Sequence, residues 1–452
     1  MAQVKSARLR PAAKSFLDSI RQFLTPEVWK QGHQAVVKKT RKCRWEVQPL
    51  VMVLVLMTWS CGESQAERFE AAKAFCVACR SKQRRPGKTV EGWQKALTRL
   101  PMPVLRAVAT AVRKRIAALL PWHVGEFIPL GCDGSRLSCP RVRELEERLG
   151  EANVENSAPT IWLTALVHLR TGVPWCWRWG RGSANERQHL LKMLPQLPPQ
   201  ALVVADAGYI GFELAKALLQ QKVSFLIRQC SLVKAYVDKP IASADFHDGI
   251  VQYWTKEAQK NGEPPLRLRL MCVRRGKKAA DSQSQDVWLM TNVLEPERLS
   301  TAQAGQMYRW RWENEGFFRT YKRTLQKMTL ESRTVELIHR EAEGSMLALQ
   351  LLLAQGALAM PRRHGQVTVQ ASPRKVLVEI RNEIRLTQVG HRRVNFAARL
   401  RNATREQRQR TTPKERRAWP TRKPAKPPKP PKILTLPKEA EAILAELQAM
   451  AA

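Results

Sequence analysis

Two apolar runs in the middle of the chain each lead into an aspartate that lies beside a glycine. The first, EFIPLGCDGSRL, carries Asp133 late in the run with Gly134 directly after it, and the second, ALVVADAGYIG, carries Asp206 before a glycine-containing turn. Short apolar runs bounded by turn residues predict buried strands. An α/β sheet places its ligands at the carboxyl ends of its strands. We therefore expect an α/β fold with Asp133 on one strand and Asp206 at the end of another, opening toward a crevice.

The segments around these aspartates predict three strands, a helix, a strand, a helix and a fifth strand. WLTALVHLRTG and VPWCWRW have the pattern of a hairpin, NERQHLLKMLPQL and FELAKALLQQ that of helices, and VSFLIR that of the fifth strand. Trp175, Trp177 and Trp179 alternate onto one face of the hairpin's second strand. Three tryptophans on one strand face favour packing within the sheet over stacking on bases.

The stretch Tyr308 to Lys322, YRWRWENEGFFRTYK, predicts a helix with charged groups on one face. At about 100° per residue, Tyr308, Arg311, Glu315 and Lys322 lie together, while Glu313 lies on the opposite side. A carboxylate flanked by cations suits a group that binds a divalent metal while its neighbours hold a nucleic-acid backbone. Taken alone, the same face could be an ordinary solvated surface.

The spacing Y-x2-R-x3-E-x6-K resembles the signature helix of the DDE transposases of bacterial insertion-sequence family four. Three further features agree with that family: DGS at Asp133, ADAGY at Asp206, and a strand-rich insertion ahead of the signature. The resemblance covers about residues 125–350. It implies an α/β fold with a ribonuclease H-like mixed sheet interrupted by a β-strand insertion, preceded by an α-helical domain and followed by a helical, basic C-terminal region.

The resemblance also implies a chemistry and a set of roles. Asp133, Asp206 and Glu315 would be the catalytic carboxylates and would hold two Mg²⁺ or Mn²⁺ ions, with Asp133 bridging them. Tyr308, Arg311 and Lys322 would clamp phosphates of the transposon end. The implied reaction is excision at terminal inverted repeats and attack of the 3′-hydroxyl ends on target DNA. The implied partners are double-stranded DNA and a second copy of the chain, in a homodimer.

The insertion falls between the fifth strand and the signature. VQYWTK, LRLRLMCV and VWLMTNVL predict strands separated by polar loops. An ordinary ribonuclease H would pass directly from strand to helix, so the insertion favours a transposase. In the family it supports bound DNA ends, and an aromatic side chain there can hold a flipped base. Tyr253, Trp254 and Trp288 are the candidates for that role.

Charge divides the chain into regions. The chain has 77 Lys and Arg against 39 Asp and Glu, which predicts a polyanionic partner. Residues 1–120 hold 24 basic and 7 acidic side chains, residues 361–432 hold 21 and 4, and residues 121–360 hold 31 and 25. We predict a helical, basic, DNA-binding domain over 1–120, a core over 121–230 and 301–360, the insertion over 231–300, and a basic region over 361–452. Within that last region RRAWPTRKPAKPPKPPK predicts a disordered strap, followed by a short helix, EAEAILAEL.

The cysteines and the apolar segments favour a reducing cytosol, and the resemblance implies the bacterial cytoplasm, with the protein on the nucleoid. Nine cysteines show no disulfide-like framework. Leu50 to Trp59 is too short to cross a bilayer and predicts a buried helix, so no membrane partner is expected. Cys76 and Cys79 form a CxxC without a second ligand pair, which argues against structural zinc. Cys132 and Cys139 are better explained as packing thiols than as ligands.

Two other classes stay open from the sequence. A nuclease on the same fold would share the three acids but would hydrolyse DNA without strand transfer, and the insertion argues against it. A non-catalytic nucleic-acid binder descended from a transposase would keep the charge and tolerate loss of an acid, yet all three acids are present. The terminal repeats, the target preference and a hairpin step cannot be predicted from the sequence.

Overall fold

The computed structural model describes most of the chain and divides it into two compact units. The described residues are 15–36, 44–80, 84–150, 157–239, 241, 245–274, 286–363, 366–367, 369–389, 395–405, 430–436, 440–443 and 445. The helical unit consists of Met1–Pro121, Leu137–Ile161 and Phe318–Glu406, and the sheet unit of Trp122–Arg136, Trp162–Phe317 and Gln407–Ala452. Each unit is therefore assembled from distant parts of the sequence, and the range 301–360 is divided between them.

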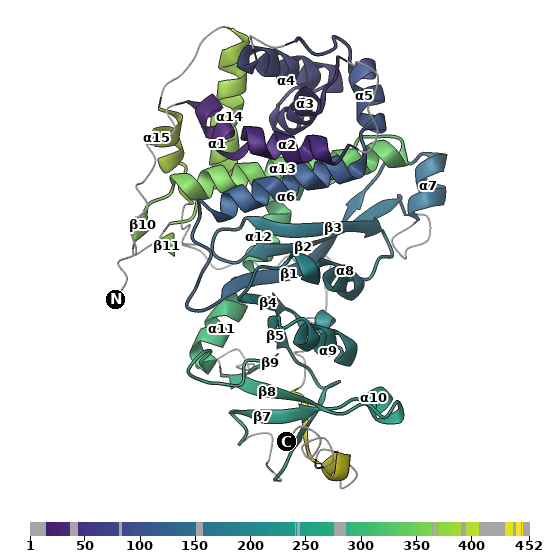
Figure 1. The fold of residues 1–452 in the computed structure, drawn as a ribbon, viewed down its shortest axis with the longest axis vertical. Coiled ribbons are helices and arrows are strands. Elements are labelled where there is room, and N and C mark those ends of the chain that lie inside the picture. Colours follow the sequence, from purple (N-terminus) through teal and green to yellow (C-terminus); the bar gives the residue numbers. More distant parts are fainter. Residues whose placement is uncertain are drawn as a thin grey trace, which may run out of the picture. The chain divides into compact units, whose positions relative to one another are not determined.

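The sheet unit is organised around one sheet with the strand order β12-β6-β7-β8-β9-β5-β4-β1-β2-β3 (Figure 1). Its strands are β1 (Ile128–Ser138), β2 (Thr160–His168), β3 (Pro174–Arg181), β4 (Ala201–Ala205), β5 (Ser224–Arg228), β6 (Lys234–Val237), β7 (Asp248–Tyr253), β8 (Leu266–Val273), β9 (Val287–Thr291) and β12 (Lys432–Thr435). β4 is parallel to both β1 and β5, whereas β9 is antiparallel to β5. All of β4 is buried, as expected for a parallel strand covered on both faces.

Helices follow the strands in the predicted order. α8 (Glu186–Met193) packs against β3, α9 (Phe212–Gln220) against β5, and α11 (Thr301–Trp310) against β4 and β8. A further short helix, α7 (Arg143–Leu149), lies between β1 and β2 in the sequence and belongs to the helical unit. The alternation of strands and helices was therefore predictable, and α7 was one element that the pattern did not indicate.

The insertion is a set of antiparallel strands that continues the sheet. β7, β8 and β9 form where strands were predicted, and β6 and the short α10 (Lys256–Lys260) are additional. The outermost strand is β12, which pairs in parallel with β6 from Lys432↔Lys234 to Thr435↔Val237. The sequence analysis predicted no strand there. The rest of the predicted strap, through residue 429, lies outside the described residues, and residues 440–443 and 445 of the predicted terminal helix are helical.

A buried ion pair ties the insertion to the start of α11. The Arg269 guanidinium on β8 donates to both carboxylate oxygens of Asp248 on β7, at 2.7 and 2.5 Å. Its third contact is the carbonyl of Leu299, at 2.8 Å, and the Thr301 hydroxyl donates to Asp248 at 2.6 Å. Because Arg269 is almost fully buried, these bonds fix the entry of α11 relative to the strands before it.

The helical unit is organised around α13. Its helices are α1 (Phe16–Phe23), α2 (Pro26–Gln34), α3 (Val47–Trp59), α4 (Gln65–Cys79), α5 (Val90–Arg99), α6 (Met102–Ala117), α7, α13 (Val335–Ala359), α14 (Pro373–Gln388) and α15 (Phe396–Arg401), with a small β10 (Arg362–Arg363) and β11 (Gln366–Val367) pair. α13 packs against α3, α5, α6, α14 and α15. α3 is buried over almost its whole length, as predicted for Leu50 to Trp59. Residues 325–334 form the connecting loop that leads into α13.

Among the described residues, α13 alone is long and apolar enough to pass a length-and-composition test for a membrane span. Its most apolar window is 83% buried inside the protein. A helix that other helices cover in this way is explained by its place in the core of the helical unit.

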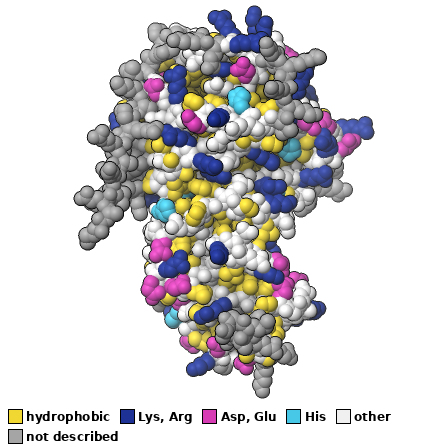
Figure 2. Space-filling model, in the orientation of Figure 1, with side chains coloured by type: hydrophobic (Ala, Val, Ile, Leu, Met, Phe, Trp, Pro, Cys, Tyr) yellow, Lys and Arg dark blue, Asp and Glu magenta, His cyan; other side chains and the backbone are white. Residues whose placement is uncertain are grey.

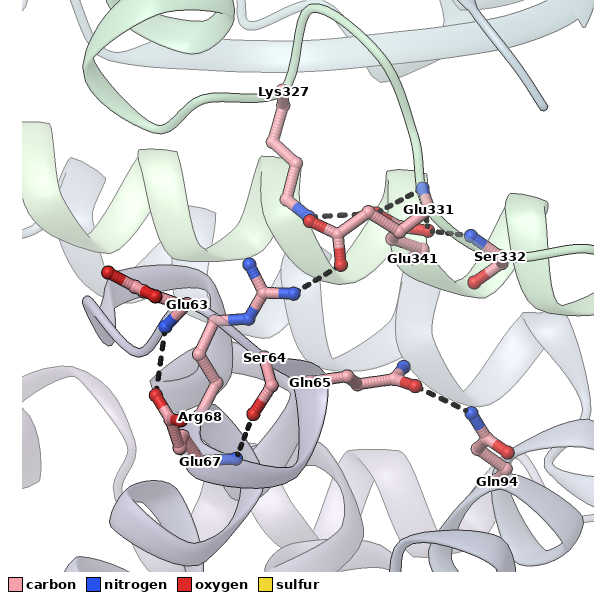
Figure 3. A network of polar contacts seen from close by, with 10 residues as sticks. All are labelled: Glu63, Ser64, Gln65, Glu67, Arg68, Gln94, Lys327, Glu331, Ser332 and Glu341. Atoms are coloured by element: carbon pink, nitrogen blue, oxygen red, sulfur yellow. Dashed lines mark hydrogen bonds and ion pairs between the residues drawn. The ribbon is translucent and has the colours of Figure 1, made fainter.

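A polar network holds the loop before α13 against that helix (Figure 3). Glu341 on α13 accepts a 2.7 Å bond from Lys327 and bonds from the backbone N–H groups of Glu331 and Ser332. Glu331 in turn pairs with Arg68 on α4. Burial on its own would raise the pKa of Glu341, but Lys327 and the Ser332 donors outweigh burial and lower the pKa. Glu341 is therefore a buried carboxylate held ionised by complete pairing.

Candidate active site

Asp133 and Asp206 lie at the same level of two neighbouring strands. β1 and β4 pair in parallel with Gly131 opposite Val204, so the same register, continued by two residues, sets Asp133 opposite Asp206. Neighbouring strands are about 4.8 Å apart. Asp133 Oδ1 accepts a 2.8 Å bond from the N–H of Gly134, and Asp206 Oδ1 accepts one of the same length from the N–H of Gly208. The sheet thus brings together the two aspartates that the sequence singled out.

The electrostatic environment shows that further charges converge on Asp133. Burial raises the pKa of this carboxyl, and the carboxylates of Asp206 and Glu315 raise it further. The Gly134 N–H and the Arg311 guanidinium act in the opposite direction. Glu315 is exposed on α12 (Glu313–Arg319) but is close enough to act on Asp133. The three predicted acids therefore belong to one electrostatic cluster.

The prediction of one continuous helix from Tyr308 to Lys322 is wrong. α11 ends at Trp310, α12 begins at Glu313, and a π-helical turn occupies Thr320–Thr324. At the first break the N–H of Arg311 bonds to the carbonyl of Tyr308 at 3.1 Å, and the N–H of Asn314 to that of Arg311 at 3.0 Å. These i to i−3 bonds are of the 3₁₀ type, with about 120° per residue, so the angles of an ideal wheel do not apply beyond Arg311.

The break has a packing cause that involves a residue that sequence reasoning missed. Asn314 is fully buried, and its side-chain amide packs on Gly131 of β1. A Cβ at Gly131 would lie only 2.6 Å from the Asn314 Nδ2 and 2.5 Å from Leu169, so only glycine permits this approach. Neither amide atom of Asn314 has a hydrogen-bond partner among the described residues. A glycine inside an apolar strand was the available signal.

The three residues predicted to clamp phosphates do not all belong to the same unit. Tyr308 and Arg311 are buried in the sheet unit, and the guanidinium of Arg311 lies 5.4 Å from the ring centre of Tyr308 and 5.3 Å from that of the exposed Trp312. Both distances are within the range of a cation–π contact. Lys322 belongs to the helical unit, where burial lowers the pKa of its amine. Tyr308 and Arg311 therefore form one packed group, and Lys322 belongs to the other unit.

A fourth carboxylate lies beside the aspartates. Burial raises the pKa of Glu186, the first residue of α8, and both Asp133 and Asp206 raise it further. Tyr209, in the turn after Asp206, and Arg136 on β1 act in the opposite direction. Sequence reasoning missed Glu186 because an acid in the first turn of a helix is ordinary.

The other sequence candidates are buried. Tyr253, Trp254 and Trp288, proposed for a flipped base, are each almost fully removed from solvent. Trp254 Nε1 donates to the carbonyl of Glu263 at 2.6 Å, which is a packing role. Of the three strand tryptophans, Trp175 and Trp179 are buried, as expected for packing within the sheet, and Trp177 is half-buried.

Burial governs the cysteine thiols. Burial raises the pKa of Cys132 well above its usual value and that of Cys139 to about 12, in keeping with packing thiols. Burial raises the pKa of Cys76 to about 11, so this half of the CxxC is no thiolate at neutral pH. Across the described part of the chain, no three His, Cys, Asp or Glu side chains already lie close enough together to hold a metal ion.

A family model matches part of the chain. Residues 138–351 match the family model described as the transposase DDE domain. The matched segment includes Asp206 and Glu315 and begins C-terminal to Asp133. This match supports a DDE transposase, an enzyme that cleaves DNA. No finer membership follows from it.

The chain also shows similarity to solved structures. Among solved structures, a piggyBac transposase synaptic complex with hairpin DNA, determined by cryo-EM, is similar with a TM-score of 0.41 and 11% sequence identity. The likeness covers 82% of this chain and 80% of that one. No curated protein sequence matches the chain.

Proposed function

We propose that the protein excises an insertion sequence at its terminal inverted repeats and joins the resulting 3′-hydroxyl ends to target DNA. The observation that carries this proposal is the β1–β4 register, which sets Asp133 and Asp206 side by side, with Glu315 near enough to act on Asp133. The transposase DDE match supports the same class. A family-four signature on a ribonuclease H-like sheet, action as a homodimer, and a place in the bacterial cytoplasm on the nucleoid are parts of the same proposal.

The residues suit hard divalent cations. Asp133, Asp206 and Glu315 offer only carboxylate oxygens, which Mg²⁺ and Mn²⁺ prefer. Two such ions would activate the attacking oxygen and neutralise the leaving oxygen of the phosphodiester. Because no three acidic groups already form a ligand set in the described residues, we expect the exposed Glu315 side chain to turn inward when it binds.

The chain's own residues hold the parts of this site in place. Glycine at 131 lets α12 pack directly on β1, which brings Glu315 to the strand that carries Asp133. The Arg269–Asp248 pair fixes the start of α11, and with it the segment that leads to Arg311. Arg311 partly offsets the negative charge at Asp133. We assign Arg311 to stabilising phosphate charge beside the carboxylates, with Tyr308 packed under it.

We assign the affinity for DNA to Lys and Arg side chains that are spread over the surface. On the face drawn in Figure 2, the described Lys and Arg side chains are spread among acidic and uncharged ones and form no single continuous patch. The whole sequence nevertheless carries a net charge of +38. Dispersed cations favour contacts with phosphates, which add affinity without reading bases.

Asp206→Asn provides the test, with Asp238→Asn as a matched control because Asp238 is an exposed aspartate in the insertion. The substrate is a DNA duplex that carries the inverted repeats found beside the gene, and the protein is assayed with Mg²⁺ or Mn²⁺. We expect Asp206→Asn to abolish cleavage and strand transfer while DNA binding in a gel shift persists. Cleavage by the parent without strand transfer would indicate a nuclease, and full activity of Asp206→Asn would refute the proposal.

A further inference from the structure

Glu186 packs directly against the backbone beside Asp133. A Cβ added at Gly134 would lie 2.7 Å from the Glu186 Oε1, so the carboxylate occupies the space that any larger residue at 134 would fill. α8 holds it there: the Asn185 side chain caps this helix by accepting a 2.9 Å bond from the N–H of Arg187. The glycine of the DGS motif is therefore explained by packing, because its lack of a side chain leaves room for the Glu186 carboxylate beside Asp133.

Polar groups without partners surround this carboxylate. Tyr209 is only 1% exposed, and its hydroxyl, which faces Glu186 and the thiol of Cys132, makes no hydrogen bond of ordinary geometry among the described residues. The indole N–H of Trp162 lies 2.6 Å from the same Cβ position at Gly134 and also has no acceptor there. Buried donors left open in this way are expected where a bound ion, water or substrate completes the bonding.

The nearby cations do not make this a simple ion pair. Arg136 stacks 4.5 Å over the ring of Trp162 and donates a 3.0 Å bond to the carbonyl of Gly182, so its hydrogen bond goes to the backbone. Burial and the carboxylates of Asp133 and Asp206 all disfavour a charge on Glu186. Three half-buried acids in one cluster are stabilised when a cation binds between them.

We propose that Glu186 is a fourth carboxylate of the site and that its side chain, with those of Asp133 and Asp206, draws together around a divalent cation when the cation binds, since these described side chains do not yet form a ligand set. This inference rests on the proposed function. Four carboxylates carry the charge that two divalent cations neutralise, whereas Asp133, Asp206 and Glu315 alone leave one positive charge uncompensated. Tyr209 is a positioning residue: its buried hydroxyl faces Glu186, and we expect it to bond to that carboxylate once a cation is bound, as outer partners of metal ligands do.

The test measures Mn²⁺ binding to the full chain without DNA, from the loss of the free Mn²⁺ signal in electron paramagnetic resonance. Glu186→Gln keeps the shape of the side chain and removes its charge, and we expect it to weaken Mn²⁺ affinity by about 10- to 100-fold. Glu213→Gln is the matched control, because Glu213 is an exposed glutamate in the first turn of α9. We expect its Mn²⁺ affinity to equal that of the parent.

Each outcome has a distinct meaning. If Asp133→Asn loses Mn²⁺ binding while Glu186→Gln retains it, the fourth carboxylate is refuted and the proposed function stands. If Asp133→Asn and Asp206→Asn both keep Mn²⁺ binding and cleavage, the proposed function itself fails. Should Glu186→Gln not fold, as judged by circular dichroism, Tyr209→Phe decides: we expect it to fold and to bind Mn²⁺ more weakly than the parent, and unchanged binding would refute the role of Glu186.

Discussion

Glu341 in the helical unit and Asp133 in the sheet unit are both carboxylates partly shielded from water, and their surroundings differ. Glu341 accepts bonds from Lys327 and from two backbone N–H groups, and its pKa is lowered. Asp133 accepts a bond from the N–H of the adjacent Gly134, lies among other acids, and has a raised pKa. A buried charge with all its partners stabilises the fold that provides them, whereas a buried charge among like charges costs stability until a cation binds.

Asp133→Asn gives the largest effect that the comparison predicts. Loss of a carboxylate that holds catalytic metal removes several kcal/mol of transition-state stabilisation, so we expect cleavage to slow by about a thousandfold or more. The midpoint of thermal unfolding should not fall, because a neutral amide suits a place where ionisation is disfavoured. The rate comes from gel-resolved cleavage and the midpoint from circular dichroism. A variant that loses stability as well as activity would show that Asp133 supports the fold.

Glu341→Gln should produce the reverse pattern. The variant removes the charge that pairs with the Lys327 amine. Both side chains are nearly buried, with 11% of Lys327 and 12% of Glu341 exposed. We expect the free energy of unfolding to fall by about 3 kcal/mol, measured by urea denaturation, while the cleavage rate of the folded protein stays at the parental value.

The pH dependence of stability tests whether the lost charge of Glu341 causes the fall in the free energy of unfolding. The pKa of Glu341 is lower in the folded than in the unfolded protein, so its contribution is fully present above the unfolded pKa and is lost as the pH falls through the folded pKa. The stability difference between parent and Glu341→Gln should therefore be large at neutral pH and shrink in acid. A difference that does not change with pH would assign the loss to packing instead of charge.

Local patterns predicted much of the sheet unit. The apolar run of β4 ends at Asp206 in the structure as in the prediction, because a buried parallel strand needs continuous apolar sequence. The insertion strands β7, β8 and β9 were visible for a related reason, since alternating and β-branched residues mark them.

The features that the sequence did not predict have a common cause. Each of them depends on contacts between residues that are far apart in the sequence. The break at Arg311 follows from the packing of Asn314 on Gly131, two residues far apart in sequence. β12 is four residues long, and its pairing with β6 joins the C-terminal region to the insertion. Glu186 looked like an ordinary residue of a helix start until the fold placed it beside Gly134.

Glu313→Gln gives the smallest effect and tests which acid of α12 belongs to the site. Both Glu313 and Glu315 lie in the first turn of this helix, where a negative charge is stabilised by the helix dipole. Loss of that charge at Glu313 should lower the free energy of unfolding by about 0.5 kcal/mol. Cleavage should stay close to the parental rate, because it is Glu315 that acts on Asp133.

Glu315→Gln is the matched partner in this experiment, since the same chemical change is made two residues away in the same helix. We expect it to fold as stably as Glu313→Gln and to be inactive in cleavage. The wheel argument that first separated the two acids fails at the 3₁₀ turn, so their assignment now depends on the charge that reaches Asp133 and no longer on helix angles. If Glu313→Gln is the inactive variant, α12 is rotated when metal and DNA bind, and Glu313 is the third ligand.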